Sequence, residues 1–234
     1  MSGSAARAVV AACCVAPLFV SPPAMAQAGR VDQVVCAEIA PYCFVENAEK
    51  KGYVYEIGRE ILRRLGQADR IEFQPLARSI HSVQNGERTI SLWLGRIPQR
   101  ENTVHWIAPI VTDAFHIYTL KNGRDAATLE KARALGVLAA TIAGSNIVAA
   151  RDLGLERIDS TASEDANGKK LLSGRVDGWI SSGAVVGNFV FRHHLDPERI
   201  VRGVKITDYT AFIVASPDVD GKTQAEWKRI HEAL

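Results

Sequence analysis

Two arginines follow an apolar segment and could bind an anion. Residues 90–94 (ISLWL) resemble a buried strand, and Arg96 and Arg100 come directly after it. A guanidinium group can hold a carboxylate through two parallel hydrogen bonds, and Pro98 would stiffen the approach to Arg100. The alternative is a surface arginine that pairs with Glu101. The position after a strand end favours a ligand-binding role, which Arg78 could share.

A second segment offers donors for an anion. Ser145 follows Gly144 and stands where a helix is expected to begin, with Asn146 next to it. Free N–H groups and the positive end of the helix dipole favour negative charge there. An ordinary helix cap without a ligand is the competing interpretation. Tyr42 and Trp93 lie near strand ends and could wall a cleft, or could be core aromatic residues.

Motifs of enzymes and of metal sites are missing from the sequence. It has no G-x-S-x-G, phosphate loop, H-E-x-x-H or G-x-G-x-x-G pattern. No His or Cys stands at ligand spacing beside Cys36 and Cys43, so we expect neither a metal nor another cofactor. An even number of cysteines in an exported chain favours a disulfide between them, with two reduced buried thiols as the alternative.

The first 26 residues have the pattern of a signal peptide. Arg7 precedes an apolar stretch at 8–20, and Ala24 and Ala26 have the spacing that a signal peptidase needs, so cleavage is expected after Ala26. Lipoprotein processing at Cys13 is the alternative. The apolar stretch is too short to span a bilayer. The formal net charge is +2 and basic residues alternate with acidic ones, which argues against a nucleic-acid partner.

The rest of the chain alternates apolar strands with amphipathic helices. This order predicts an α/β fold with mainly parallel sheets. A helix, a glycine and a buried strand occur at 80–94 and again at 167–182, which favours two similar lobes over one continuous sheet. The late strand at 209–216 should return to the first lobe. Ligands of such sheets bind beyond the carboxyl ends of the strands, so a cleft is expected between the lobes.

The order of several segments resembles a known family. A-P-Y-C-F after the first strand is followed by LRRLG, PLAR, GERTISLWLGRIPQRE, WIAPI, AGSN and SGRVDGWISS. This order over residues 31–234 resembles the periplasmic solute-binding proteins of polar amino acid ABC transporters (bacterial extracellular solute-binding family 3). The resemblance implies a two-lobed periplasmic-binding-protein-like fold of type II with two hinge strands. Lobe one would comprise 31–114 plus 206–234, and lobe two 115–205.

The resemblance also implies roles for particular residues. The carboxylate-binding arginine falls on Arg100, the hydroxyl at the helix N-terminus on Ser145, and an aromatic residue near Tyr42. Ser182 stands where the family commonly has an aspartate that binds the ligand's ammonium group. A carboxylate without an amino group, or a dicarboxylate between Arg96 and Arg100, is therefore an open alternative. The candidate ligand-binding residues are Arg100, Ser145, Asn146, Tyr42, Ser182, Arg96, Trp93 and Arg78.

The function implied by the resemblance is capture of a small solute in the periplasm. The ligand would be a small polar amino acid or a related carboxylate, delivered by a monomer to an inner-membrane ABC permease without cofactor or chemistry. One alternative is a dehydratase-like enzyme on the same scaffold, with Glu38 or His105 as the acid or base. Another is a sensor or partner-binding domain that no longer transports solute.

Overall fold

The computed structural model describes residues 31–86 and 88–234, so the expected signal peptide and its cleavage site lie outside the described residues. The strands are β1 Gln33–Ala37, β2 Phe44–Glu46, β3 Glu49–Lys51, β4 Ile71–Gln74, β5 Thr89–Gly95, β6 His105–Leu120, β7 Leu138–Thr141, β8 Ile158–Thr161, β9 Gly178–Ser182 and β10 Ile200–Ala215. The helices are α1 Tyr53–Arg64, α2 Leu76–Gln84, α3 Leu129–Arg133, α4 Ser145–Asp152, α5 Glu164–Leu172, α6 Gly183–Arg192 and α7 Gly221–Glu232. Two 3-10 helices cover Pro98–Arg100 and Pro197–Arg199.

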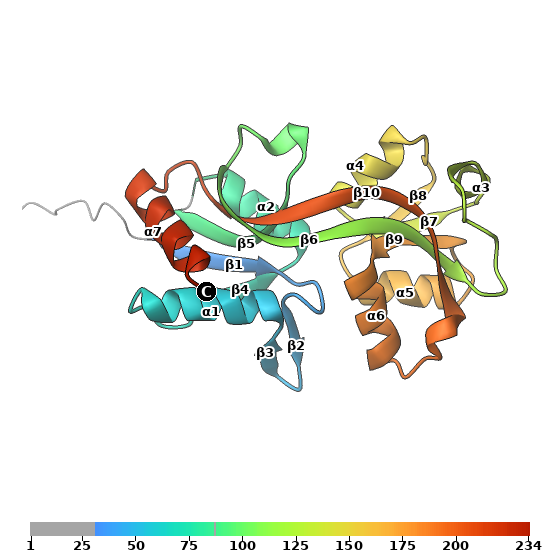
Figure 1. The fold of residues 1–234 in the computed structure, drawn as a ribbon, viewed down its shortest axis with the longest axis horizontal. Coiled ribbons are helices and arrows are strands. Elements are labelled where there is room, and N and C mark those ends of the chain that lie inside the picture. The colour runs from blue at the N-terminus through green and yellow to red at the C-terminus, as the bar shows by residue number, and fades with distance from the viewer. Residues whose placement is uncertain (1–30, 87) are drawn as a thin grey trace, which may run out of the picture.

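Eight of the ten described strands form one curled sheet that two lobes share, while β2 and β3 pair with one another in a separate hairpin (Figure 1). The strand order is β4-β1-β5-β10-β6-β9-β7-β8, parallel within each outer group of three and antiparallel around β10 and β6. Lobe one holds β1 to β5 with α1, α2 and α7, and lobe two holds β7 to β9 with α3 to α6. The predicted two-lobed α/β fold with two connecting strands is confirmed.

The two connecting strands join the lobes into one continuous sheet, which the sequence pattern does not predict. β6 and β10 are 16 residues each and pair with one another along both lobes, so hydrogen bonding continues from one lobe into the other. The sequence favoured lobes with separate sheets. The sheet is continuous because each long strand also pairs at one end with β5 or β9. The lobe boundaries expected at 114/115 and 205/206 fall inside these strands and stay a prediction.

Helix α1 forms as its apolar pattern predicts. Ile61 and Leu62 are fully buried on its inner face, and the chain leaves the helix at Gly66, whose φ is +66°. Gly58 lets α1 lie close to β5, because a Cβ there would stand 2.3 Å from Leu92 Cδ1. This contact fixes the helix on one face of the lobe-one sheet.

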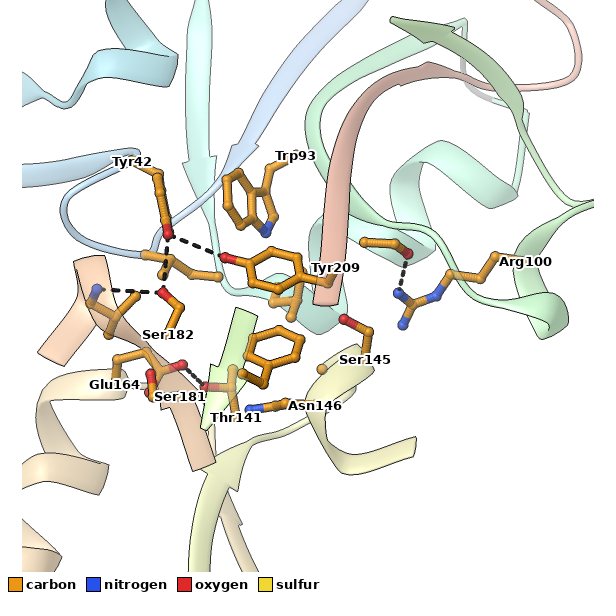
Figure 2. A pocket seen from close by; sticks show the side chains of 16 residues that line it. Tyr42, Trp93, Arg100, Thr141, Ser145, Asn146, Glu164, Ser181, Ser182 and Tyr209 are labelled. Atoms are coloured by element: carbon orange, nitrogen blue, oxygen red, sulfur yellow. Dashed lines mark hydrogen bonds between the residues drawn. The ribbon is translucent and has the colours of Figure 1, made fainter. Parts of the chain in front are cut away.

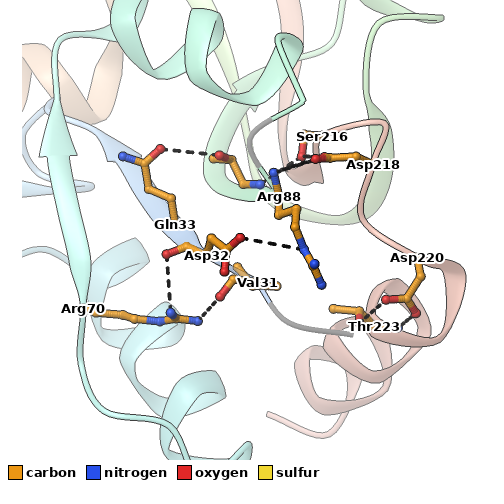
Figure 3. A network of polar contacts seen from close by, with 10 residues as sticks. Val31, Asp32, Gln33, Arg70, Arg88, Ser216, Asp218, Asp220 and Thr223 are labelled. Atoms are coloured by element: carbon orange, nitrogen blue, oxygen red, sulfur yellow. Dashed lines mark hydrogen bonds and ion pairs between the residues drawn. The ribbon is translucent and has the colours of Figure 1, made fainter. Parts of the chain in front are cut away.

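Lobe one is completed by a segment that is distant in the sequence (Figure 3). The Asp218 carboxylate accepts hydrogen bonds from the Arg88 backbone N–H at 2.9 and 3.1 Å, and Ser216 Oγ accepts from the N–H of Thr89 at 2.9 Å. Trp227 of α7 is 1% exposed, so this helix contributes to the core. The chain after β10 is therefore an integral part of the first lobe.

A disulfide joins Cys36 at the end of β1 to Cys43. It closes a short loop with a sequence separation of 7 residues, and that loop carries Tyr42. Gly52 packs on the same loop at φ +121°, where a Cβ would stand 2.1 Å from the Tyr42 carbonyl oxygen. The backbone at Tyr42 is thus constrained by the disulfide and by the close approach of Gly52.

Removing this disulfide should lower the free energy of unfolding. We expect Cys36→Ala/Cys43→Ala to cost about 2 kcal/mol, because the unfolded chain regains the freedom that a loop of this length loses on closure. Urea unfolding measures the change. A reductant should produce a similar loss in the native protein and none in the variant. Equal stability of variant and native protein would contradict the expectation.

Candidate ligand-binding site

A small cavity lies where the two lobes meet (Figure 2). Its volume, counted as room for the centres of water molecules, is about 40 Å³. Both lobes contribute to its walls: Ile39, Tyr42, Leu76, Trp93, Gly95, Arg100, Phe115, Thr141, Gly144, Ser145, Asn146, Glu164, Ser181, Ser182, Val185 and Tyr209. Six of the eight predicted ligand-binding residues are therefore brought together here, although only a few water molecules would fit at this separation of the lobes.

Arg100 is buried and connects the lobes. The 3-10 helix Pro98–Arg100 aims its side chain inward, where Nη1 donates to the Gly95 carbonyl at 2.9 Å and Nη2 donates to the Ala143 carbonyl at 2.7 Å. Gly95 belongs to lobe one and Ala143 to lobe two. Burial lowers the pKa of Arg100 from its ordinary value, but a guanidinium starts high enough to stay charged. These two bonds use only part of its five N–H donors.

The N-terminus of α4 faces Arg100 from lobe two. Gly144 precedes the helix and Ser145 begins it. The lobes are nearly in contact at this point, because a Cβ on Gly95 would stand 2.7 Å from Ser145 Oγ. Asn146 is buried and donates from Nδ2 to the Ile180 carbonyl at 2.9 Å, which fixes α4 against β9. A carboxylate between Arg100 and Ser145 would meet a cation, a hydroxyl and helix N–H groups together.

Aromatic side chains fill the centre of the cavity. The Tyr42 ring stacks on Trp93 with centroids 4.1 Å apart, and Tyr209 stacks on Phe115 at 4.0 Å. The Tyr42 hydroxyl oxygen lies 3.1 Å from Ser182 Oγ and 3.2 Å from the Tyr209 hydroxyl oxygen. Burial raises the pKa of Tyr42 and brings that of Tyr209 to about 12, so both hydroxyls are neutral. The Tyr42–Ser182 contact is a second bridge between the lobes.

Ten of the sixteen lining residues are not among the predicted ones, and they include Phe115, Thr141, Glu164 and Tyr209. Phe115 and Tyr209 come from β6 and β10, and their positions depend on the pairing of these strands, which the sequence does not reveal. Glu164 follows the helix cap Ser163, and an acidic residue there is ordinary in any helix. The strand pattern ending at Thr141 was a usable signal, because ligand sites gather at such ends.

Two predicted residues do not line the cavity. Arg96 forms two 2.8 Å hydrogen bonds with the Glu101 carboxylate and lies over the Trp106 ring, 5.0 Å from its centroid. Arg78 is exposed on α2. The arrangement thus offers Arg100 without Arg96, which does not favour a dicarboxylate held between them. Both alternative acids or bases, Glu38 and His105, are exposed and do not line this cavity, and His105 lies beside the Pro217 carbonyl.

Within residues 31–86 and 88–234, no helix is long and apolar enough to cross a membrane. The same residues contain no cluster of three or more His, Cys, Asp or Glu side chains that could hold a metal ion.

Comparisons with known proteins place the fold. No family model matches the chain, and no curated protein sequence matches it. Among solved structures it is similar to an arginine-bound form of ArgBP from T. maritima, with 16% identity, 86% of this chain and 95% of that chain covered, and a TM-score of 0.76. It is similar also to an ancestral arginine-binding protein bound to glutamine (16% identity, 87% and 92% covered, TM-score 0.75). A third is a histidine kinase sensor domain with similarity to periplasmic binding proteins (17% identity, 86% and 89% covered, TM-score 0.74).

At these identities the likeness establishes the architecture. The chain has the two-lobed fold of periplasmic-binding-protein-like domains, with its cavity at the junction of the lobes. What the solved structures bind belongs to those proteins.

Proposed function

We propose that the protein captures a small amino acid or related carboxylate between its lobes, as the periplasmic component of an ABC transporter. The observation that carries this proposal is Arg100, a buried guanidinium at the lobe junction opposite the N-terminus of α4. A ligand carboxylate there would contact both lobes and would hold them together. The similar ArgBP from T. maritima binds arginine and the ancestral arginine-binding protein is bound to glutamine, which supports this class of solute.

Related features complete the proposal. Export through cleavage after Ala26, the periplasmic location, a monomeric state and delivery to a permease come from the sequence pattern and its resemblance. Binding without chemical conversion is part of the same proposal, because the roles of Arg100 and Ser145 require only hydrogen bonding. A ligand recovered chemically unchanged after long incubation would support it, and product formation would favour the enzyme alternative.

A thermal-shift screen tests the proposal. Residues 27–234 would be unfolded and refolded to remove carried ligand, and then heated with amino acids, 2-oxo acids and other carboxylates. A ligand present at about 100 times its dissociation constant should add roughly 2.7 kcal/mol to the stability of the native state. At least one of these compounds should raise the melting temperature. A folded protein that responds to none would contradict solute capture and favour the sensor or partner-binding alternative, which the histidine kinase sensor domain illustrates.

A further inference from the structure

We propose that Glu164 binds a cationic nitrogen of the ligand, so that the cavity selects zwitterionic amino acids over 2-hydroxy and 2-oxo acids of the same skeleton. This proposal rests on the proposed function. Arg100 would bind the ligand's carboxylate, and Glu164 would bind its cationic nitrogen elsewhere in the same cavity. The resemblance to the binding-protein family implies an ammonium-binding residue at the end of β9. The residue there is Ser182, whose side chain is neutral. Glu164 comes from a different element, the start of α5.

The groups around Glu164 suit an ionised carboxylate. Oε1 accepts a hydrogen bond from Thr141 Oγ1 at 2.5 Å, and Oε2 accepts one from Trp179 Nε1 at 2.8 Å. Ser181 Oγ and Asn167 Nδ2 each lie 3.5 Å from Oε2. The indole and amide nitrogens can only donate. The surrounding chain therefore supplies donors to both oxygens, as a carboxylate that only accepts requires.

The described chain places no cation against this carboxylate. Basic residues of α5 are engaged elsewhere: Lys169 pairs with Asp165 at 2.7 Å, and Lys170 pairs with Asp159 at 2.7 Å. A buried carboxylate without an opposite charge is costly, and burial raises the pKa of Glu164 accordingly. A ligand ammonium group would provide the missing charge, and the contacts of Ser181 and Asn167, at 3.5 Å, are the ones it could replace.

Glu164 is also positioned where a ligand can reach it. It lines the small cavity and, in addition, a larger groove of about 590 Å³, whose walls include Phe44 and Asn188. Figure 2 shows Glu164 and Arg100 at opposite ends of the cavity, with Tyr209 between them. A ligand between them would meet a positive group on one side and a negative group on the other, which matches the charges of a zwitterion.

Matched pairs of ligands test the assignment by calorimetry on the refolded protein. The probes are L-alanine, L-serine, L-glutamate, L-phenylalanine and L-arginine, each with its L-2-hydroxy analogue. For every pair that binds, we expect the amino acid to bind about tenfold or more tightly, because a hydrogen-bonded ion pair replaces a neutral contact. In Glu164→Gln, which keeps the shape and the acceptor oxygen, this ratio should fall to about threefold or less.

Asp165→Asn is the matched control, since it removes one carboxylate from the same turn of α5, where Asp165 pairs with Lys169 and His193. Its ratio should equal that of the native protein. The comparison within the native protein needs no variant, so equal affinities would overturn the proposal even if Glu164→Gln did not fold. Equal affinity of amino and hydroxy acids, or an unchanged ratio in Glu164→Gln, would overturn the role of Glu164 alone. Failure of every probe to bind would overturn the proposed function, and this role with it.

Discussion

Replacing Arg100 with methionine should weaken ligand binding about a hundredfold or more. Each hydrogen bond from a guanidinium to a carboxylate contributes about 1.5–3 kcal/mol, and two such bonds would be lost. The change also leaves the carbonyl oxygens of Gly95 and Ala143 without the donors that now join the lobes. Titration calorimetry with the best compound from the thermal-shift screen gives the ratio of dissociation constants.

Arg96→Met is the matched control for this experiment. Arg96 is half-exposed, pairs with Glu101 and does not line the cavity, so its loss should change affinity by about twofold at most. The two variants also distinguish the roles of Arg96 and Arg100, both of which the sequence predicts as ligand-binding residues. If Arg100→Met bound ligand like the native protein, or if Arg96→Met lost as much affinity, the carboxylate site would lie elsewhere.

Gly95→Val should keep the lobes from closing to the observed separation. A Cβ at this position would stand 2.7 Å from Ser145 Oγ and 3.3 Å from Ser145 Cβ, and valine adds two further methyl groups. A serine hydroxyl can rotate away, but its Cβ cannot move without α4. We expect a loss of ligand affinity of about tenfold to a hundredfold. Small-angle X-ray scattering with saturating ligand should show a larger radius of gyration than the native complex.

Gly187→Ala provides the control for a glycine substitution. Gly187 lies in α6, and a Cβ there meets no atom of the described chain within 4 Å. Alanine should therefore stabilise the protein by about 0.5–1 kcal/mol and leave affinity and scattering unchanged. A native-sized complex of Gly95→Val with native affinity would show that contact between β5 and α4 does not control closure.

The sequence predicts the elements well where local patterns decide them. The spacing of apolar residues in α1, its end at Gly66 and the apolar run of β5 all correspond to the structure. Arg100 and Ser145 could be selected because each follows a strand, and strand ends collect at the cleft. Local chemistry and general topology together are enough for these positions.

Local sequence patterns do not predict the full length of the long strands or the position of the short β2–β3 hairpin. Pro109 interrupts the apolar pattern of β6, yet the strand continues, because Pro109 pairs opposite Phe212 where the register shifts. The β2–β3 hairpin turns through Asn47 and Ala48 with φ of 53° and 63°, and an alanine gives no signal for such a turn. Tyr209 and Phe115 reach the cavity through strand register alone, so only the structure places them.

Because both lobes use β6 and β10, the order of these strands in the sequence determines the order in which the two lobes can fold. Lobe two consists of one continuous segment between these strands. Its helices and strands can therefore pack together as soon as that segment has been synthesised. Lobe one cannot be completed so early, because β5 pairs with β1 on one side but has β10 on the other, and α1 packs against α7 as well as against β5. During synthesis one edge of β5 and the α7 side of α1 therefore lack their final neighbours until more than a hundred later residues have been made. The earliest part of the described chain is thus among the last to reach its final packing.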